Sequence, residues 1–113
     1  FIGLGLLGSP LVASASDLAK AASIIQGRCM PCHSTAEKKG GLVLTNRDAM
    51  LKGGDSAIAA LIPGNSADSP LIARITATDA ADRMPPEGSP LTDDDVAVLR
   101  AWIDAGAEWQ DLD

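Results

Sequence analysis

Large aromatic side chains are nearly absent from this chain of 113 residues, which has one phenylalanine, two tryptophans and no tyrosine. A domain of this size buries only roughly two-thirds of its unfolded surface, so the loss of large core side chains matters. We therefore expect another group to fill part of the centre. Basic residues are also few, nine against fifteen acidic ones. The net charge of −6 argues against a nucleic-acid partner and favours a basic one.

Cysteine and histidine are scarce as well, and all of them lie within five positions, Cys29-Met30-Pro31-Cys32-His33. C-x-x-C-H is the attachment sequence of c-type haem, in which two thiols bond to the haem vinyl groups and the histidine is carried to the iron. Because no other cysteine or histidine exists, a four-ligand zinc site is not expected. A disulfide between the two cysteines closes too small a loop to stabilise the fold much.

An exported thiol-disulfide oxidoreductase is the alternative, since C-x-x-C followed by histidine also occurs in such proteins. There the motif follows a buried strand, whereas here it follows an alanine-rich pattern over 16–27 that predicts a helix. We expect Ser16 or Asp17 to cap this helix and Gly27 to end it. Its apolar positions share one face: Leu18, Ala21 and Ile25.

The second axial ligand of a six-coordinate haem has to be a methionine or a lysine, because the chain has no second histidine. Met84 begins the stretch MPPEGSP, where proline holds an extended loop at little further entropic cost. Met30 lies inside the attachment loop, and Met50 is expected to fill a gap in the core. We therefore predict that Met84 faces His33 across the iron.

Short helices and loops are expected between the motif and the C-terminal helix. Residues 40–62 are rich in glycine and predict an ordered loop around the haem, with a short helix at 47–52. Ser69 is expected to cap a helix that runs to about residue 77, with proline at its first position. Residues 79–90 predict a loop.

The C-terminal helix has the clearest start signal. Thr92 is in position to cap it, Asp95 lies in capping-box register, and Gly106 is expected to end it. Its apolar stripe is formed by Val96, Leu99 and Ile103. Trp102 is expected to pack in the helix core, with contact to the porphyrin edge as the alternative.

Residues 1–15 carry no charge and end in small residues, as a secretory signal does. The segment has no initiator methionine and no basic residue, so we expect that upstream residues are missing. As a helix it would reach about 22 Å, short of the hydrocarbon core of roughly 30 Å. It is interpreted as a retained membrane anchor or the remainder of a signal sequence. Either interpretation places residues 16–113 outside the cytoplasm.

The motifs from Cys29 to Trp109, taken in order, resemble the planctomycete-type cytochrome c domain, a branch of the class I cytochrome c superfamily. The segments that carry the resemblance are CMPCH, KGG, KGGDS, PGN, SPL, RMPP and AWIDAGA. The resemblance implies an all-α fold with crossing first and last helices around one haem c. It also implies specific roles: Cys29 and Cys32 hold the haem, His33 is the proximal ligand and Met84 the distal one.

We expect residues 16–113 to form a mono-haem electron-transfer domain, not an enzyme, that docks briefly with a redox protein or a membrane electron-transfer complex. Arg28, Lys38 and Lys39 form the one basic patch near the expected haem edge. A haem-based sensor of small ligands, in which Met84 dissociates, is a further alternative. The rigidity expected of the proline-containing loop that Met84 begins argues against this sensor function.

Overall fold

The computed structural model describes residues 15–111, and within that range it contains helices and loops but no β-strand. The elements are α2 (Ala15–Arg28), the 3-10 turn η1 (Lys39–Gly41), α3 (Arg47–Lys52), α4 (Pro70–Ile75) and α5 (Asp93–Asp104). The predicted all-α fold is confirmed. The expected anchor or signal at 1–15 lies, apart from its last residue, outside the described residues. No helix within 15–111 is long and apolar enough to cross a membrane.

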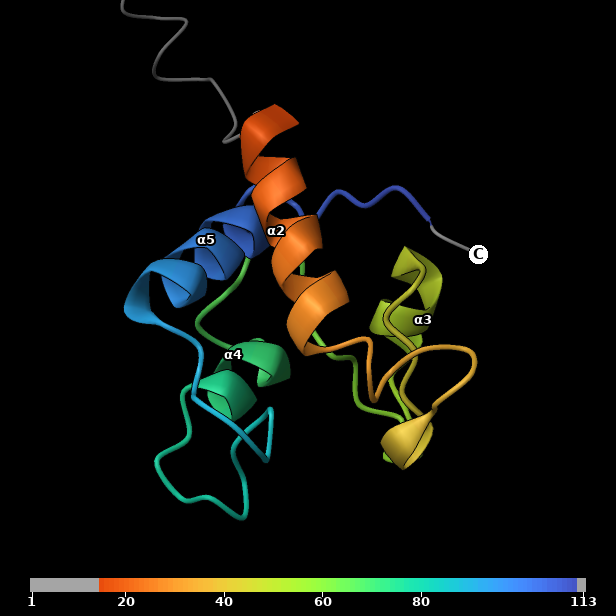
Figure 1. Ribbon diagram of the computed structural model, residues 1–113. Coiled ribbons are helices and arrows are strands. Elements are labelled where there is room, and N and C mark those ends of the chain that lie inside the picture. The colour runs from red at the N-terminus through yellow and green to blue at the C-terminus, as the bar shows by residue number, and fades with distance from the viewer. Residues whose placement is uncertain (1–14, 112–113) are drawn as a thin grey trace, which may run out of the picture.

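The two longest helices, α2 and α5, pack against each other and cross, and α4 also contacts α5 (Figure 1). The core is built from the predicted stripes, with Leu18 and Val96 only partly buried at its margin. The buried members on these two helices are Ala21, Ile25, Leu99, Trp102 and Ile103. Full burial of each large apolar side chain contributes about 1.5–3 kcal/mol, so this crossing contributes substantially to the stability of the domain.

The start of α2 differs from the prediction. The helix begins at Ala15, so Ser16 and Asp17 lie inside its first turn and neither one precedes it as a cap. Alanine has the most favourable helix propensity of all residues, which allows the helix to include it.

The end of α2 also differs, because Gly27 lies inside the helix. The amide N–H groups of Cys29 and Met30 both donate to the carbonyl of Ile25, at 3.0 and 2.9 Å. The helical hydrogen bonding therefore continues past the glycine. Glycine costs about 1 kcal/mol relative to alanine in a helix, less than the burial of Ile25 contributes. The helix therefore leads directly into the C-x-x-C-H motif.

Side-chain caps define the starts of α3 and α5. The hydroxyl of Thr92 accepts from the Asp95 N–H at 3.1 Å, as predicted. The side-chain oxygen of Asn46 accepts from the Ala49 N–H at 2.8 Å, and α3 spans the predicted residues 47–52. Each cap satisfies one of the free N–H groups of a helix start, a contribution of about 1 kcal/mol.

The end of α5 follows the glycine-based pattern expected from the sequence. Gly106 has φ 111°, a conformation that side-chain-bearing residues rarely adopt. The N–H groups of Gly106 and Ala107 return to the carbonyls of Ile103 and Trp102, both at 2.9 Å. This pair of bonds is a Schellman motif, and it stops the helix just after Asp104.

Ser69 precedes α4, but its hydroxyl does not cap the helix. It donates to the Asn65 carbonyl and accepts from the Ile62 N–H, each at 2.8 Å. The prediction that the Ser69 side chain caps α4 was therefore wrong. Its buried hydroxyl bonds to backbone groups of the turn before the helix instead.

The C-terminus of α4 is shorter than predicted and ends at Ile75 rather than near Ala77. In a longer helix the carbonyl of Arg74 would accept from the amide four residues later. Here the amide N–H of Met84 donates to that carbonyl, at 2.9 Å. The end of α4 therefore places Met84.

Met50 and Trp102 are buried core side chains, at 0% and 1% exposure. The Trp102 indole N–H donates to the Glu108 carbonyl at 2.7 Å, and its ring lies 6.0 Å from that of Trp109. Both residues therefore have the core role that the sequence favoured.

Candidate functional site

A cavity of about 460 Å³ opens between the end of α2, the loop around η1, α4 and the loop that follows α4. Cofactor and ligand sites typically occupy about 300–1,000 Å³. Its walls are largely apolar, with side chains that include Leu42, Leu44, Ile58, Leu71, Ile75 and Pro85. Met50 and Trp102 are not among the lining residues.

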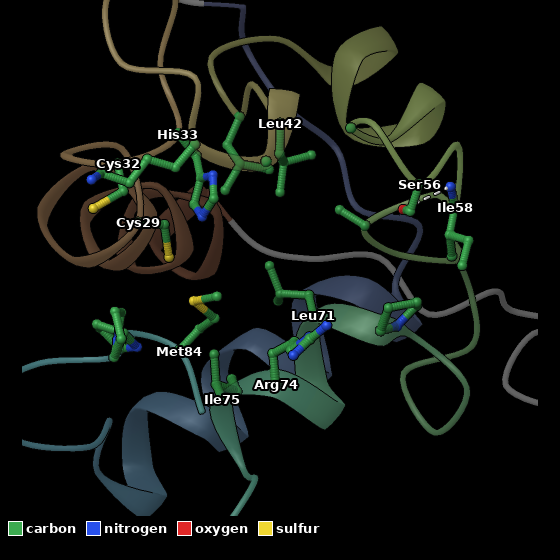
Figure 2. Close-up of a pocket in the computed structure, with 18 of the residues that line it drawn as sticks. Cys29, Cys32, His33, Leu42, Ser56, Ile58, Leu71, Arg74, Ile75 and Met84 are labelled. Carbon is green, nitrogen blue, oxygen red and sulfur yellow. Dashed lines mark hydrogen bonds between the residues drawn. The ribbon is translucent and has the colours of Figure 1, made fainter. Parts of the chain in front are cut away.

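All four predicted site residues border this cavity: Cys29, Cys32, His33 and Met84. Figure 2 shows His33 on one side together with the cysteines, and Met84 on the other side with its sulfur turned toward them. The fold therefore brings the motif together with a side chain from a loop some fifty positions later in the sequence.

The motif forms a tight turn directly after α2. The amide N–H groups of Cys32 and His33 both donate to the Cys29 carbonyl, at 3.2 and 3.0 Å. The carbonyls of Cys32 and His33 accept from the N–H groups of Lys39 and Leu44, both at 2.9 Å. These bonds tie the turn to the loop around η1 and fix the wall that carries His33.

The His33 ring has a buried nitrogen without a partner. Within residues 15–111, its Nδ1 is the buried side-chain polar atom that makes no hydrogen bond. Such an atom costs about 1–3 kcal/mol when it is left unpaired, and buried polar groups are normally paired. In a metal-ligating histidine one ring nitrogen binds the metal and a second partner holds the other. The unpaired Nδ1 of His33 is consistent with a ring whose partner is a bound group.

Both cysteine thiols are free. Burial raises the pKa of the Cys29 thiol to about 11, and the positive charge of Arg28 opposes only part of that rise. Disulfide exchange needs a thiolate, so Cys29 is in the wrong protonation state for it at neutral pH. The lack of a strand before the motif, within the described residues, argues against a thioredoxin-like site in the same way.

The residues present fit a covalently attached haem. Two free thiols and an imidazole with an unpaired, buried Nδ1 lie on one wall, a thioether faces them, and the remaining walls are mostly apolar. No group of three or more histidine, cysteine or acidic side chains in the described part of the chain is arranged to hold a metal by itself. An all-α domain with this site defines the class of c-type cytochromes.

A model of the planctomycete cytochrome C family matches residues 29–88, more than half of the chain, and the chain belongs to that family. No curated protein and no solved structure shows a significant match. Membership supports haem-based electron transfer in general, through covalent haem c, rather than enzymatic activity. Cytochrome c domains are typically extracytoplasmic.

Sequence reasoning did not identify how the loop at 79–90, called the distal loop below, is held. Three guanidinium groups donate to its backbone carbonyls: those of Arg28, Arg74 and Arg83. Of the predicted basic patch, Lys38 and Lys39 are exposed, whereas Arg28 is half-buried and bonded to the distal loop. No sequence signal predicts these bonds, because a carbonyl acceptor is present at every residue.

Two wall residues on α4 were also interpreted only as scaffold. Leu71 and Ile75 lie one turn apart and both border the cavity. Their i, i+4 spacing could have identified them from the sequence, because it places both side chains on the same face of a helix.

Proposed function

We propose that this protein transfers single electrons through one covalently bound haem c with His33 and Met84 as axial ligands. The observation that carries the proposal is the position of the Met84 thioether opposite the His33 ring, across a cavity that both free cysteines border. When bound, haem c supplies a one-electron Fe(III)/Fe(II) couple.

The side chains of the cavity have distinct roles in this proposal. Cys29 and Cys32 would hold one edge of the haem, and His33 and Met84 would supply its two axial ligands. Apolar walls exclude water, and a low dielectric disfavours the additional positive charge of ferric iron. A neutral thioether ligand acts in the same direction, so we expect a raised midpoint potential.

A sensor of small ligands is supported less well by the same geometry. Such a sensor needs an axial position that opens easily, whereas the loop carrying Met84 is held by three arginines and by the Met84 N–H bond to α4. Electron transfer with both axial positions filled is therefore the function that the site supports best.

The native protein provides the first test. Its mass is expected to exceed that of the polypeptide by one haem, and the haem is expected to stay attached in denaturant. The ferric form is expected to show the near-infrared band of a thioether–iron bond. A chain mass without haem contradicts the attachment, and a ferric spectrum of five-coordinate iron contradicts the proposed ligand pair.

We propose that the partner is a redox protein or a membrane electron-transfer complex that approaches the cavity near η1. Lys38 and Lys39 are exposed there, and Lys39 borders the cavity. These two cations stand out on a chain with a net charge of −6. Electrostatic steering by such a patch raises the encounter rate and weakens as salt screens it.

We further propose that the domain is extracytoplasmic and tethered through residues 1–15. The native protein should then remain with membranes through high-salt and carbonate washes, because salt does not screen the burial of apolar side chains. Replacing Leu6 and Leu7 with lysine should release it, since each lysine costs about 2.5–3.5 kcal/mol in the centre of a membrane helix.

Two results contradict the tether. One is a mature N-terminus at Ser16 in the soluble exported fraction. The other is a double-lysine variant that stays in the membrane fraction as fully as the wild type does. An Ala13→Ser variant, which adds no charge, serves as the matched control and should stay bound.

A further inference from the structure

The second half of the distal loop has almost no support from its own backbone. In the described part of the chain, no hydrogen bond between backbone groups involves residues 85–91. The backbone bonds of the loop stop at Met84, whose N–H donates to the Arg74 carbonyl. Something other than secondary structure must therefore hold the segment after Met84 against the cavity.

Two guanidinium groups supply that support. Arg83 donates to the carbonyls of Pro85 and Gly88, at 3.3 and 3.2 Å, and so closes the loop on itself. Arg28 donates to the carbonyl of Ser89 from outside the loop. A guanidinium is permanently charged and planar, so its hydrogen bonds are stronger than neutral ones and strongly directional.

The position of Arg28 makes its bond different from the others. It is the last residue of α2 and directly precedes Cys29, and it borders the same cavity. Ser89 lies five positions beyond Met84 in the distal loop, which borders the cavity at Met84, Pro85 and Pro86. The Arg28 bond thus joins the wall that carries the cysteines and His33 to the loop that carries Met84.

We propose that Arg28 is a positioning residue that fastens the distal loop and so keeps the Met84 thioether at the iron. The proposal rests on Met84 being the distal ligand. Arg28 does not touch the reacting atoms; it acts by lowering the population of an open loop. Arg74 bonds the loop at Asp82, before Met84: it donates to the Asp82 carbonyl at 3.3 Å, and its 3.9 Å contact with the Asp82 carboxylate joins side chains that are both more than half exposed.

The test compares Arg28→Gln with Arg100→Gln in the holoprotein. Arg100 is exposed on α5 and undergoes the same chemical change, so it is a matched control. Carbon monoxide binds ferrous haem only when the distal ligand has left, and its association rate therefore reports the open population. Loss of one exposed hydrogen bond should raise this rate about threefold to tenfold in Arg28→Gln and leave Arg100→Gln at the wild-type rate.

A second readout does not depend on the haem spectrum. Glu87 is exposed in the distal loop, and a glutamate-specific protease should cut there about threefold to tenfold faster in Arg28→Gln. Cleavage after Glu37 and Glu108, which are exposed elsewhere, should be unchanged and calibrates the assay. If Arg28→Gln gives too little holoprotein, Arg28→Met retains a long side chain without a donor and serves the same comparison.

A double variant separates positioning from a general structural effect. In a Met84→Ala background no thioether has to leave, so adding Arg28→Gln should change the carbon monoxide rate by less than about twofold. Arg28→Lys keeps a charged donor and should stay within about twofold of the wild type. An equal increase with and without Met84, or an Arg28→Gln rate equal to that of Arg100→Gln, overturns the proposal.

Failure of the proposed ligand is distinguishable from failure of this inference. If Met84 is not the ligand, Met84→Ala leaves both the near-infrared spectrum and the carbon monoxide rate of the wild type unchanged. If Met84 is the ligand but Arg28 does not position it, Met84→Ala removes the thioether band of the ferric protein. The carbon monoxide association rate of Arg28→Gln then equals that of the Arg100→Gln control.

Discussion

Met84→Ala is expected to leave the haem covalently attached while removing the near-infrared band of the ferric protein. The cysteines that hold the ring are unchanged, but the neutral sulfur donor on the opposite wall is lost. The midpoint potential should fall by an amount on the order of 100 mV, because axial ligands are a principal determinant of haem potential. Carbon monoxide should bind at least about a hundredfold faster, since the open fraction rises from about 1% or less to nearly all molecules.

Met50→Ala is the matched control for this experiment. It makes the same chemical change at a side chain that is 0% exposed and packed in the core. It should lower the free energy of unfolding by about 2–5 kcal/mol and retain the near-infrared band. The opposite pattern, with the band lost in Met50→Ala and kept in Met84→Ala, would make Met50 the distal ligand.

Replacing both Cys29 and Cys32 with alanine is expected to abolish covalent attachment. Acid acetone should then remove all haem from the variant and none from the wild type, because only the wild type has thioether bonds to the ring. Loss of haem should also unfold much of the domain. A mostly apolar cavity of about 460 Å³ is large for a chain with three aromatic residues, and a tightly bound group stabilises the folded state that holds it.

The matched control for the cysteine variant is Ser56→Ala. Ser56 also borders the cavity, and the change removes one small heteroatom there, whereas the double cysteine variant removes two. This variant should keep all of its haem in acid acetone and all of its helical circular dichroism. A double cysteine variant that retains haem under the same extraction contradicts attachment through these thiols.

Much of the fold was predictable because its signals are local. The Thr92 cap, the 47–52 helix and the terminating Gly106 each depend on residues within a few positions of one another, and the structure confirms all three. The errors occurred where a distant group competes with a local one. α4 ends earlier than predicted: the Ala77 amide turns back to the Arg74 carbonyl three residues before it, and the Met84 amide, nine residues beyond Ile75, donates to the same carbonyl.

The candidate site likewise has one part that local sequence predicts and one part that depends on the fold. C-x-x-C-H identifies its own chemistry, because two thiols and an imidazole must be contiguous to hold one edge of a haem and reach its iron. For the opposite wall the sequence favoured Met84 among three methionines, because Met84 begins a proline-containing loop, but no local signal shows that this loop reaches the motif. The fold buries Met50 in the core and brings Met84 to the cavity.

By itself the sequence determined the all-α class, the Thr92 cap and the attachment motif, since each is specified by side chains close together in the chain. The tertiary structure decided what faces the motif and how it is held there. Arg28 reaches a carbonyl 61 positions away, and Arg83 supports a segment without backbone bonds of its own. A guanidinium can pair with any carbonyl within reach, so only the packing of α2 against α5 and the course of the distal loop select Ser89.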